Sequence, residues 1–167
     1  MDDQTAMRQL TADPGFLLSR VGAAIRAGFK DVLAGWQVRP LQYLILLVLD
    51  GGGGASQQEL CAAAGVDSGN MVELLDGLEA LGYASRARDP RDRRRYVVTI
   101  TQDGQSALGE LRRAVEEYTA GFLSPLTEAE RQRLAGILGK LYLTSAGGQP
   151  SASVRPRVVP PPGDAYR

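Results

Sequence analysis

Large apolar residues recur every three or four positions along three stretches of the chain, a spacing that predicts amphipathic helices. In the first stretch, residues 14–36, the stripe consists of Leu18, Val21, Ile25, Phe29 and Val32. In the second, which Thr101 caps and Pro125 ends, it consists of Leu108, Leu111, Val115, Tyr118 and Phe122. In the third, which a capping box at Thr127 and Glu130 opens, it consists of Leu134, Ile137, Leu138 and Leu141.

A shorter helix is predicted between the first two stretches. Pro40 suits the first position of a helix, and residues 41–49 are apolar almost all round, which is typical of a helix at the centre of a core. Four consecutive glycines, residues 51–54, end this pattern. They predict a flexible connector, because glycine offers no side chain to pack.

The spacing of a helix-turn-helix follows the glycines. Ser56 and Glu59 form a capping box that opens a short helix. Gly65 turns the chain, and Asp67 is the N-cap predicted for a longer helix over residues 68–81. A short helix, a tight glycine turn and a longer helix are the elements of this DNA-binding motif.

A β-hairpin with a basic tip is predicted next. Six arginines lie within residues 86–95, and the strand-like residues 96–101 follow directly. Asp89 and Pro90 favour a turn, and apolar side chains alternate along the second strand. Arginines on such a hairpin, beside a pair of helices, can bind DNA phosphates and enter a minor groove. A solvated charged loop is the competing interpretation.

Composition limits the possible functions. The chain has 167 residues, of which 44% are hydrophobic, so one domain with one core is expected. It carries 19 basic and 19 acidic residues, so any affinity for DNA depends on local clusters of charge. No histidine is present and Cys61 is the only cysteine, which excludes Ser-His and Cys-His catalytic sites and the usual zinc sites. We therefore expect no enzyme, no catalytic residue, no metal and no cofactor.

Two further expectations concern location and the ends of the chain. The longest apolar run, residues 43–49, is too short to span a membrane, and the N-terminus has no signal pattern, so a cytoplasmic protein without membrane contact is expected. Residues 1–13 are expected to be flexible. Residues 145–167, which contain five prolines, are expected to form a disordered tail.

Several short motifs resemble those of the MarR family of bacterial transcription regulators. The wing motif consists of Asp92-Arg93-Arg94, a short strand and Ile100-Thr101. The accompanying motifs are Leu74-Leu75-Asp76 and Leu78-Glu79 upstream, Gly82 before the wing, and Asp103-Gly104 after it. The resemblance covers about residues 14–144. It implies a mainly α fold with a small β-hairpin wing, a winged helix-turn-helix DNA-binding lobe over residues 40–101, and an α-helical dimerisation region from the N- and C-terminal helices.

The chain departs from this family at two places. Arg39 precedes Pro40 where the family often has a threonine cap. No Lys or Arg lies between Pro40 and Ser85, and Glu73 and Gly77 stand where family members commonly carry basic residues. The helix expected to enter the major groove therefore lacks positive charge of its own.

The candidate DNA-binding residues lie on this helix, on the helix before it and on the wing. Asparagine can pair with adenine, a carboxylate can accept from cytosine, and glycine permits close approach. Asp92 either holds the Arg94 guanidinium in place or is a solubilising turn residue. We expect affinity to be concentrated in the wing arginines. The full set of candidates is Gln57, Ser68, Gly69, Asn70, Glu73, Arg86, Arg88, Arg91, Asp92, Arg93, Arg94 and Arg95.

The resemblance also implies a mode of action. Such regulators bind double-stranded DNA as homodimers at palindromic operators, most often as repressors, and small aromatic or phenolic ligands release them. Trp36 and Tyr43 are candidate walls of a ligand site, with Arg20 or Arg26 as the anion partner; the competing interpretation places both aromatic residues in the core. Cys61 is expected to be a small buried hydrophobic residue rather than a redox switch.

Two other classes of function compete with that of a DNA-binding regulator. The absence of basic residues from residues 68–81 keeps open a winged-helix protein-interaction module without specific DNA binding. A small enzyme is disfavoured, because the chain lacks both the catalytic pairs named above and a phosphate-binding Gly-Lys motif.

Overall fold

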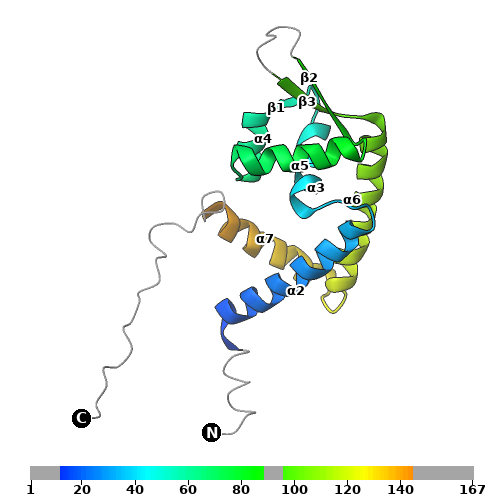
Figure 1. Ribbon diagram of the computed structural model, residues 1–167. Helices are drawn as coiled ribbons and strands as arrows, with labels where there is room; N and C mark the ends of the chain where they lie inside the picture. The colour runs from blue at the N-terminus through cyan, green and yellow to red at the C-terminus, as the bar shows by residue number, and fades with distance from the viewer. Residues whose placement is uncertain (1–11, 89–95, 145–167) are drawn as a thin grey trace, which may run out of the picture. The chain divides into compact units, whose positions relative to one another are not determined.

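The computed structural model describes residues 12–88 and 96–144, and divides into two compact units, Met1–Ser124 and Pro125–Arg167. With the labels of Figure 1, the first unit contains α2 (Pro14–Ala34), α3 (Pro40–Asp50), β1 (Ala55–Ser56), α4 (Gln57–Ala64), α5 (Ser68–Ala80), β2 (Ala84–Arg88), β3 (Tyr96–Ile100) and α6 (Gln102–Phe122). The second contains α7 (Glu128–Thr144). The expectations for residues 1–11, the hairpin tip and the tail from residue 145 lie outside the described residues.

Local caps begin the helices where the sequence predicts. The Ser56 hydroxyl accepts from the backbone N–H of Glu59, whose carboxylate accepts from the Ser56 N–H, so the predicted capping box of α4 is present. Thr101 caps α6 by accepting from the Gly104 N–H at 2.9 Å. The predicted box of α7 is also formed by Thr127 with Glu130. These bonds satisfy N–H groups that a helix leaves unpaired at its first turn.

The hairpin is the expected antiparallel pair, extended by a strand that the sequence did not predict. β2 pairs with β3 from Ala84 opposite Ile100 to Arg88 opposite Tyr96. β1 pairs with the other edge of β3, which is therefore the central strand. Gly54 permits this pairing: its φ is +76°, and a β-carbon there would lie 2.6 Å from Val97 Cγ1. The last glycine of the run is thus required for close packing with β3 as well as for connection.

The core of the first unit lies around α3, which packs against α2, α4, α5, α6 and β3. Full burial of one aliphatic side chain stabilises a fold by about 1.5–3 kcal/mol, so this cluster is the main source of stability. Cys61 packs against it but is only partly buried, whereas the sequence predicted a buried residue. The buried set is Leu33, Val38, Ile45, Leu46, Leu49, Leu60, Met71, Leu74, Leu75, Leu78, Ala84, Val98, Leu108 and Leu111.

The long helices α2 and α6 approach closely at Gly28. A β-carbon at position 28 would overlap the Tyr118 hydroxyl, which donates to the backbone carbonyls of Ala24 and Ile25. The first turns of α2 nevertheless leave large apolar residues exposed, namely Leu17, Leu18 and Val21. A glycine therefore sets the contact between α2 and α6, while the N-terminal part of α2 keeps an uncovered apolar surface.

The second unit exposes most of its apolar residues. α7 contains no buried residue. Its exposed large apolar side chains are Ile137, Leu138, Leu141, Tyr142 and Leu143. Among the described residues, no helix combines the length and the hydropathy that crossing a bilayer requires.

Candidate nucleic-acid interface

A glycine turn connects the two helices of the helix-turn-helix, and a hydrogen bond holds their N-terminal ends together. Gly65 turns the chain between α4 and α5 with a φ of +66°, a left-handed conformation that favours glycine. Gln57 Nε2 donates to the Ser68 carbonyl at 3.2 Å, so the first residues of α4 and α5 lie together. Helix N-termini carry free N–H groups and partial positive charge, which suits them to phosphate.

Asp67 caps α5 and holds Asn70. Its carboxylate accepts from the backbone N–H of Asn70 at 3.0 Å and from the side-chain amide of Asn70 at 2.6 Å. The backbone hydrogen bond is the largest of the influences that lower the pKa of the Asp67 carboxyl. The side-chain nitrogen of Asn70 therefore already has a partner in the absence of DNA.

One side of α5 is buried and the opposite side is exposed. Met71, Leu74, Leu75 and Leu78 pack into the core. The exposed residues include the predicted Ser68, Gly69, Asn70 and Glu73, which the helix brings to one surface. Val72, which is 40% exposed, also lies outside the buried stripe and was not among the predicted contacts. Its position relative to the leucines was a signal that could have identified it, since an exposed apolar residue can contact a thymine methyl group.

Glu73 has a partner that the sequence did not reveal. Arg39, at the N-cap of α3, places Nη1 2.8 Å from Glu73 Oε1. The residue that departs from the expected threonine cap thus supplies a positive charge beside α5. Its own backbone N–H donates to Gln42 Oε1, which completes the start of α3 without a capping side chain at position 39.

Arg86 is held by α5 rather than projecting from the wing. Its backbone N–H and Nε donate to the two carboxylate oxygens of Glu79 at 2.8 and 2.9 Å, and Nη2 pairs with Asp76. The Arg86 side chain is only 22% exposed. The DNA contact predicted for Arg86 stays a prediction, and its observed interactions fasten β2 to α5.

The described part of the wing shows two cross-strand contacts. The Arg88 guanidinium lies over the Tyr96 ring, 5.6 Å from its centroid, and the hydroxyls of Ser85 and Thr99 are 3.1 Å apart. The other predicted wing residues, Arg91, Asp92, Arg93, Arg94 and Arg95, lie outside the described residues. Figure 1 shows β2 and β3 side by side, with β2 following the C-terminal end of α5.

The candidate ligand residues lie on α2, on α3 and in the turn between them, which contains Trp36. Trp36 Nε1 donates to Glu110 Oε2 at 3.2 Å, and the Tyr43 ring meets the edge of Phe29 with centroids 5.7 Å apart. Burial raises the pKa of Tyr43. Arg20 and Arg26 are exposed on α2. The ligand role of these four residues stays a prediction, and both aromatic residues also pack against the core.

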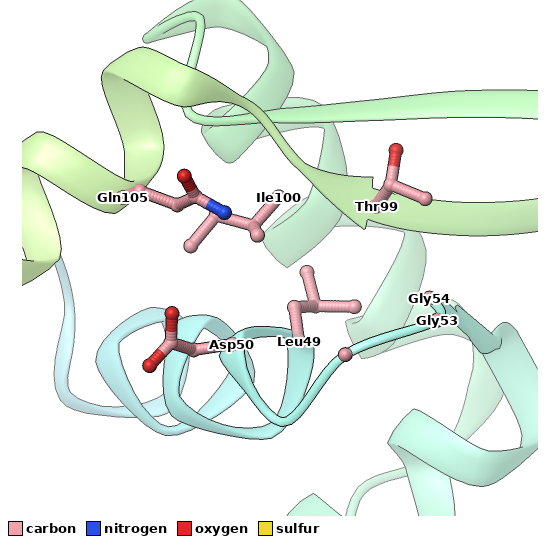
Figure 2. Close-up of a pocket in the computed structure, with 8 residues that line it drawn as sticks. Leu49, Asp50, Gly53, Gly54, Thr99, Ile100 and Gln105 are labelled. Atoms are coloured by element: carbon pink, nitrogen blue, oxygen red, sulfur yellow. The ribbon is translucent and has the colours of Figure 1, made fainter.

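Cavities among the described residues have other linings, as two of them show. One, of about 330 Å³, lies between the end of α3, the glycine run, β3 and the start of α6. Figure 2 shows Leu49 and Ile100 among the side chains that line it, with the Asp50 carboxylate and Gln105 toward one end. Asp50 also pairs with Arg112 at 2.9 Å. The second, of about 230 Å³, is lined by Lys30, Ala34, Gln37, Val38, Arg39 and Pro40.

Comparisons with known proteins agree on the family. Residues 36–95 match the sequence model of the MarR family. A protein of Thauera aromatica, described as a transcriptional regulatory protein for the hcr operon, is 34% identical over 134 residues, which cover 80% of this chain and 81% of that protein.

Solved structures agree with this result. The transcriptional repressor CouR, bound to a 23-mer DNA duplex, has a TM-score of 0.72 and 29% identity over 81% of this chain and 96% of its own. CouR from Rhodococcus jostii RHA1 is also known bound to p-coumaroyl-CoA, with a TM-score of 0.67 and 26% identity over 83% of this chain and 94% of its own. BpsR of Bordetella bronchiseptica, whose DNA binding is regulated by 6-hydroxynicotinic acid, has a TM-score of 0.66 and 26% identity over 77% of this chain and 92% of its own. With its helix-turn-helix and its β2–β3 wing, the chain belongs to the MarR family of transcriptional regulators.

Proposed function

We propose that this protein represses transcription by binding double-stranded DNA, with α5 in the major groove and the wing on the adjacent backbone. The observation that carries the proposal is the orientation of α5. Its leucines fasten it to the core, while Ser68, Gly69 and Asn70 are exposed at the end that Asp67 caps. Helices of this kind contact base edges through their N-terminal residues, and flanking groups contact phosphates.

A footprint on the DNA that flanks the gene, repeated over a range of salt concentrations, tests this proposal. We expect protection of a two-fold symmetric site, with affinity that falls steeply as salt rises, because phosphate contacts release counterions. A reporter gene behind that site should be expressed less when the protein is present. Increased expression would contradict repression, and no protection at low salt would contradict DNA binding altogether.

A homodimer is part of the proposal. One recognition helix and one wing read one half-site, so a palindromic site requires two copies. The exposed apolar residues of α7 and of the first turns of α2, including Leu18 and Leu141, support this assembly, because surfaces of this kind commonly form contacts between proteins. Each surface belongs to an element that the family resemblance assigns to dimerisation.

We also propose release of DNA by a small aromatic or phenolic ligand. The p-coumaroyl-CoA bound to CouR and the 6-hydroxynicotinic acid that regulates BpsR each carry a hydroxylated aromatic ring, which supports this class. Trp36 is the only tryptophan, so its fluorescence reports directly on the predicted site. Hydroxylated aromatic carboxylates should change this fluorescence and weaken DNA binding over the same concentration range. A ligand that weakens DNA binding without altering Trp36 would place the effector elsewhere.

One observation favours a second function, that of a protein-interaction module. α5 contains no Lys or Arg and exposes Glu73 and Asp76, which disfavours contact with phosphates. The footprint separates the two proposals, since a module without DNA recognition would protect no site at any salt concentration.

A further inference from the structure

Three carboxylates of α5 are paired with arginines from outside the helix. Glu73 pairs with Arg39, which precedes α3, whereas Asp76 and Glu79 pair with Arg86 of β2. The recognition helix has no positive charge of its own. Its surface charge is therefore set by two residues that flank it in space and lie on either side of it in the sequence.

The two arginines differ in how many guanidinium N–H donors remain available to another molecule. Arg86 is 22% exposed, and its guanidinium is divided between Glu79 and Asp76. Arg39 is 51% exposed, and its ion pair with Glu73 uses one terminal nitrogen, Nη1. A guanidinium has five N–H donors in a planar fork, so an arginine held through one nitrogen can still present its other donors to an oxyanion.

The backbone of Arg39 is held in place relative to α5. Gln42 Oε1 accepts from the Arg39 backbone N–H at 2.9 Å, while Gln42 Nε2 donates to the Leu74 carbonyl on α5 at 3.0 Å. One buried side chain therefore links the start of α3 to the recognition helix. Lys30 lines the same cavity as Arg39, so a second positive charge lies nearby.

We propose that Arg39 is a DNA-phosphate contact beside α5, and that Glu73 is the positioning residue that holds its guanidinium. The inference rests on the proposed DNA-binding function and adds a contact to it. Arg39 comes from an element alongside α5, so it meets the edge of the groove, where phosphates run, rather than the base edges that α5 itself faces. Pairing with Arg39 also neutralises Glu73, which would otherwise repel the phosphates.

The fold should tolerate the variants that test this contact. An exposed ion pair contributes little to stability, so Arg39→Ala should remain folded, which circular dichroism and thermal unfolding can verify. Arg112 provides a matched control. It also forms a 2.9 Å pair with a carboxylate, Asp50, and is 44% exposed, but it lies on α6. Arg39→Lys tests whether charge alone is sufficient.

Binding is measured by fluorescence anisotropy with the full chain, on the footprinted site and on an unrelated duplex, over a range of salt. Arg39→Ala should weaken binding to both duplexes about tenfold and reduce the slope of log K against log salt by about two, because each copy in the homodimer loses one phosphate contact. Arg39→Lys should restore part of the affinity and the slope. Arg112→Ala should bind as the unaltered protein does.

Glu73→Gln separates positioning from simple repulsion. As a single substitution it should weaken DNA binding a few-fold, because Arg39 loses its partner. Combined with Arg39→Ala it should strengthen DNA binding relative to Arg39→Ala alone, because an unpaired carboxylate is removed. An unchanged salt slope in Arg39→Ala, or a loss confined to the footprinted site, would overturn the phosphate contact while leaving the proposed function intact. Failure of the unaltered protein to bind either duplex would overturn both.

Discussion

Gln42 on α3 occupies the space beside Gly77 on α5, where an added β-carbon would lie 2.5 Å from Gln42 Nε2. Gln42 is the buried polar residue of the described core, with 3% of its surface exposed. Through its hydrogen bonds to Arg39 and Leu74 it connects α3 with the recognition helix. Gly77, which replaces a residue that is commonly basic in the family, is therefore explained by packing within the protein.

Gly77→Ala should destabilise the protein by about 1–3 kcal/mol, because displacement of Gln42 leaves buried polar groups without partners. Gly109→Ala is the matched control on the exposed side of α6, where an added β-carbon meets no atom within 4 Å. It should be neutral or stabilising by up to about 1 kcal/mol, since alanine favours helix. Urea unfolding measures both, and equal stability of the two variants would contradict the argument.

The cap at Asp67 should make stability depend on pH in the acid range. The hydrogen bonds from Asn70 hold the pKa of Asp67 below its ordinary value of 3.8, so the carboxylate is favoured in the folded state. This contribution is fully present above pH 3.8 and is lost as the pH falls through the lower folded pKa. Asp67→Asn cannot titrate. The free energy of unfolding of both proteins is measured between pH 2 and 6. The unaltered protein should be more stable than Asp67→Asn at pH 6, and this difference should disappear toward pH 2; a constant difference would contradict this assignment.

Val72 should contribute to base discrimination. If it contacts a thymine methyl group, replacing that thymine with deoxyuridine should weaken DNA binding about fourfold. This factor corresponds to roughly 0.8 kcal/mol, the typical contribution of one buried methylene or methyl group. Val72→Ala should bind the two duplexes almost equally. Anisotropy titrations with single substitutions across the protected site measure this difference. Equal sensitivity of both proteins at every thymine would exclude the contact.

Dimerisation should depend on the apolar side chains of α7. Ile137→Asp with Leu141→Asp places charges on residues that are each 51% exposed in the single chain. The variant should sediment as a monomer and lose most of its affinity for the palindromic site, because each half-site then binds alone. Val48→Asp, at an exposed apolar position on α3, is the control and should sediment as the unaltered protein does. A concentration-independent monomer mass for the unaltered protein would instead reject the dimer.

Features that depend on near neighbours were predictable. The caps at Ser56, Asp67, Thr101 and Thr127 each join residues three apart, so their hydrogen bonds can be inferred from the order of residues. The hairpin was also predicted, because Asp89 and Pro90 favour a turn and apolar residues alternate along residues 96–100, which pair with residues 84–88. β1 was not, since two residues after a glycine run carry no pattern of their own.

The sequence by itself determined the helices, the helix-turn-helix, the hairpin and the family, because periodicity, caps and motifs are local properties of the chain. Only the tertiary structure decided the charge environment of α5. Arg39 and Glu73 are 34 residues apart and became partners because Gln42 places the start of α3 against α5. Arg86, which belongs to the basic segment of the wing, forms ion pairs with Glu79 and Asp76 of α5. Coulombic attraction depends on distance in space, and the packing of the core sets that distance.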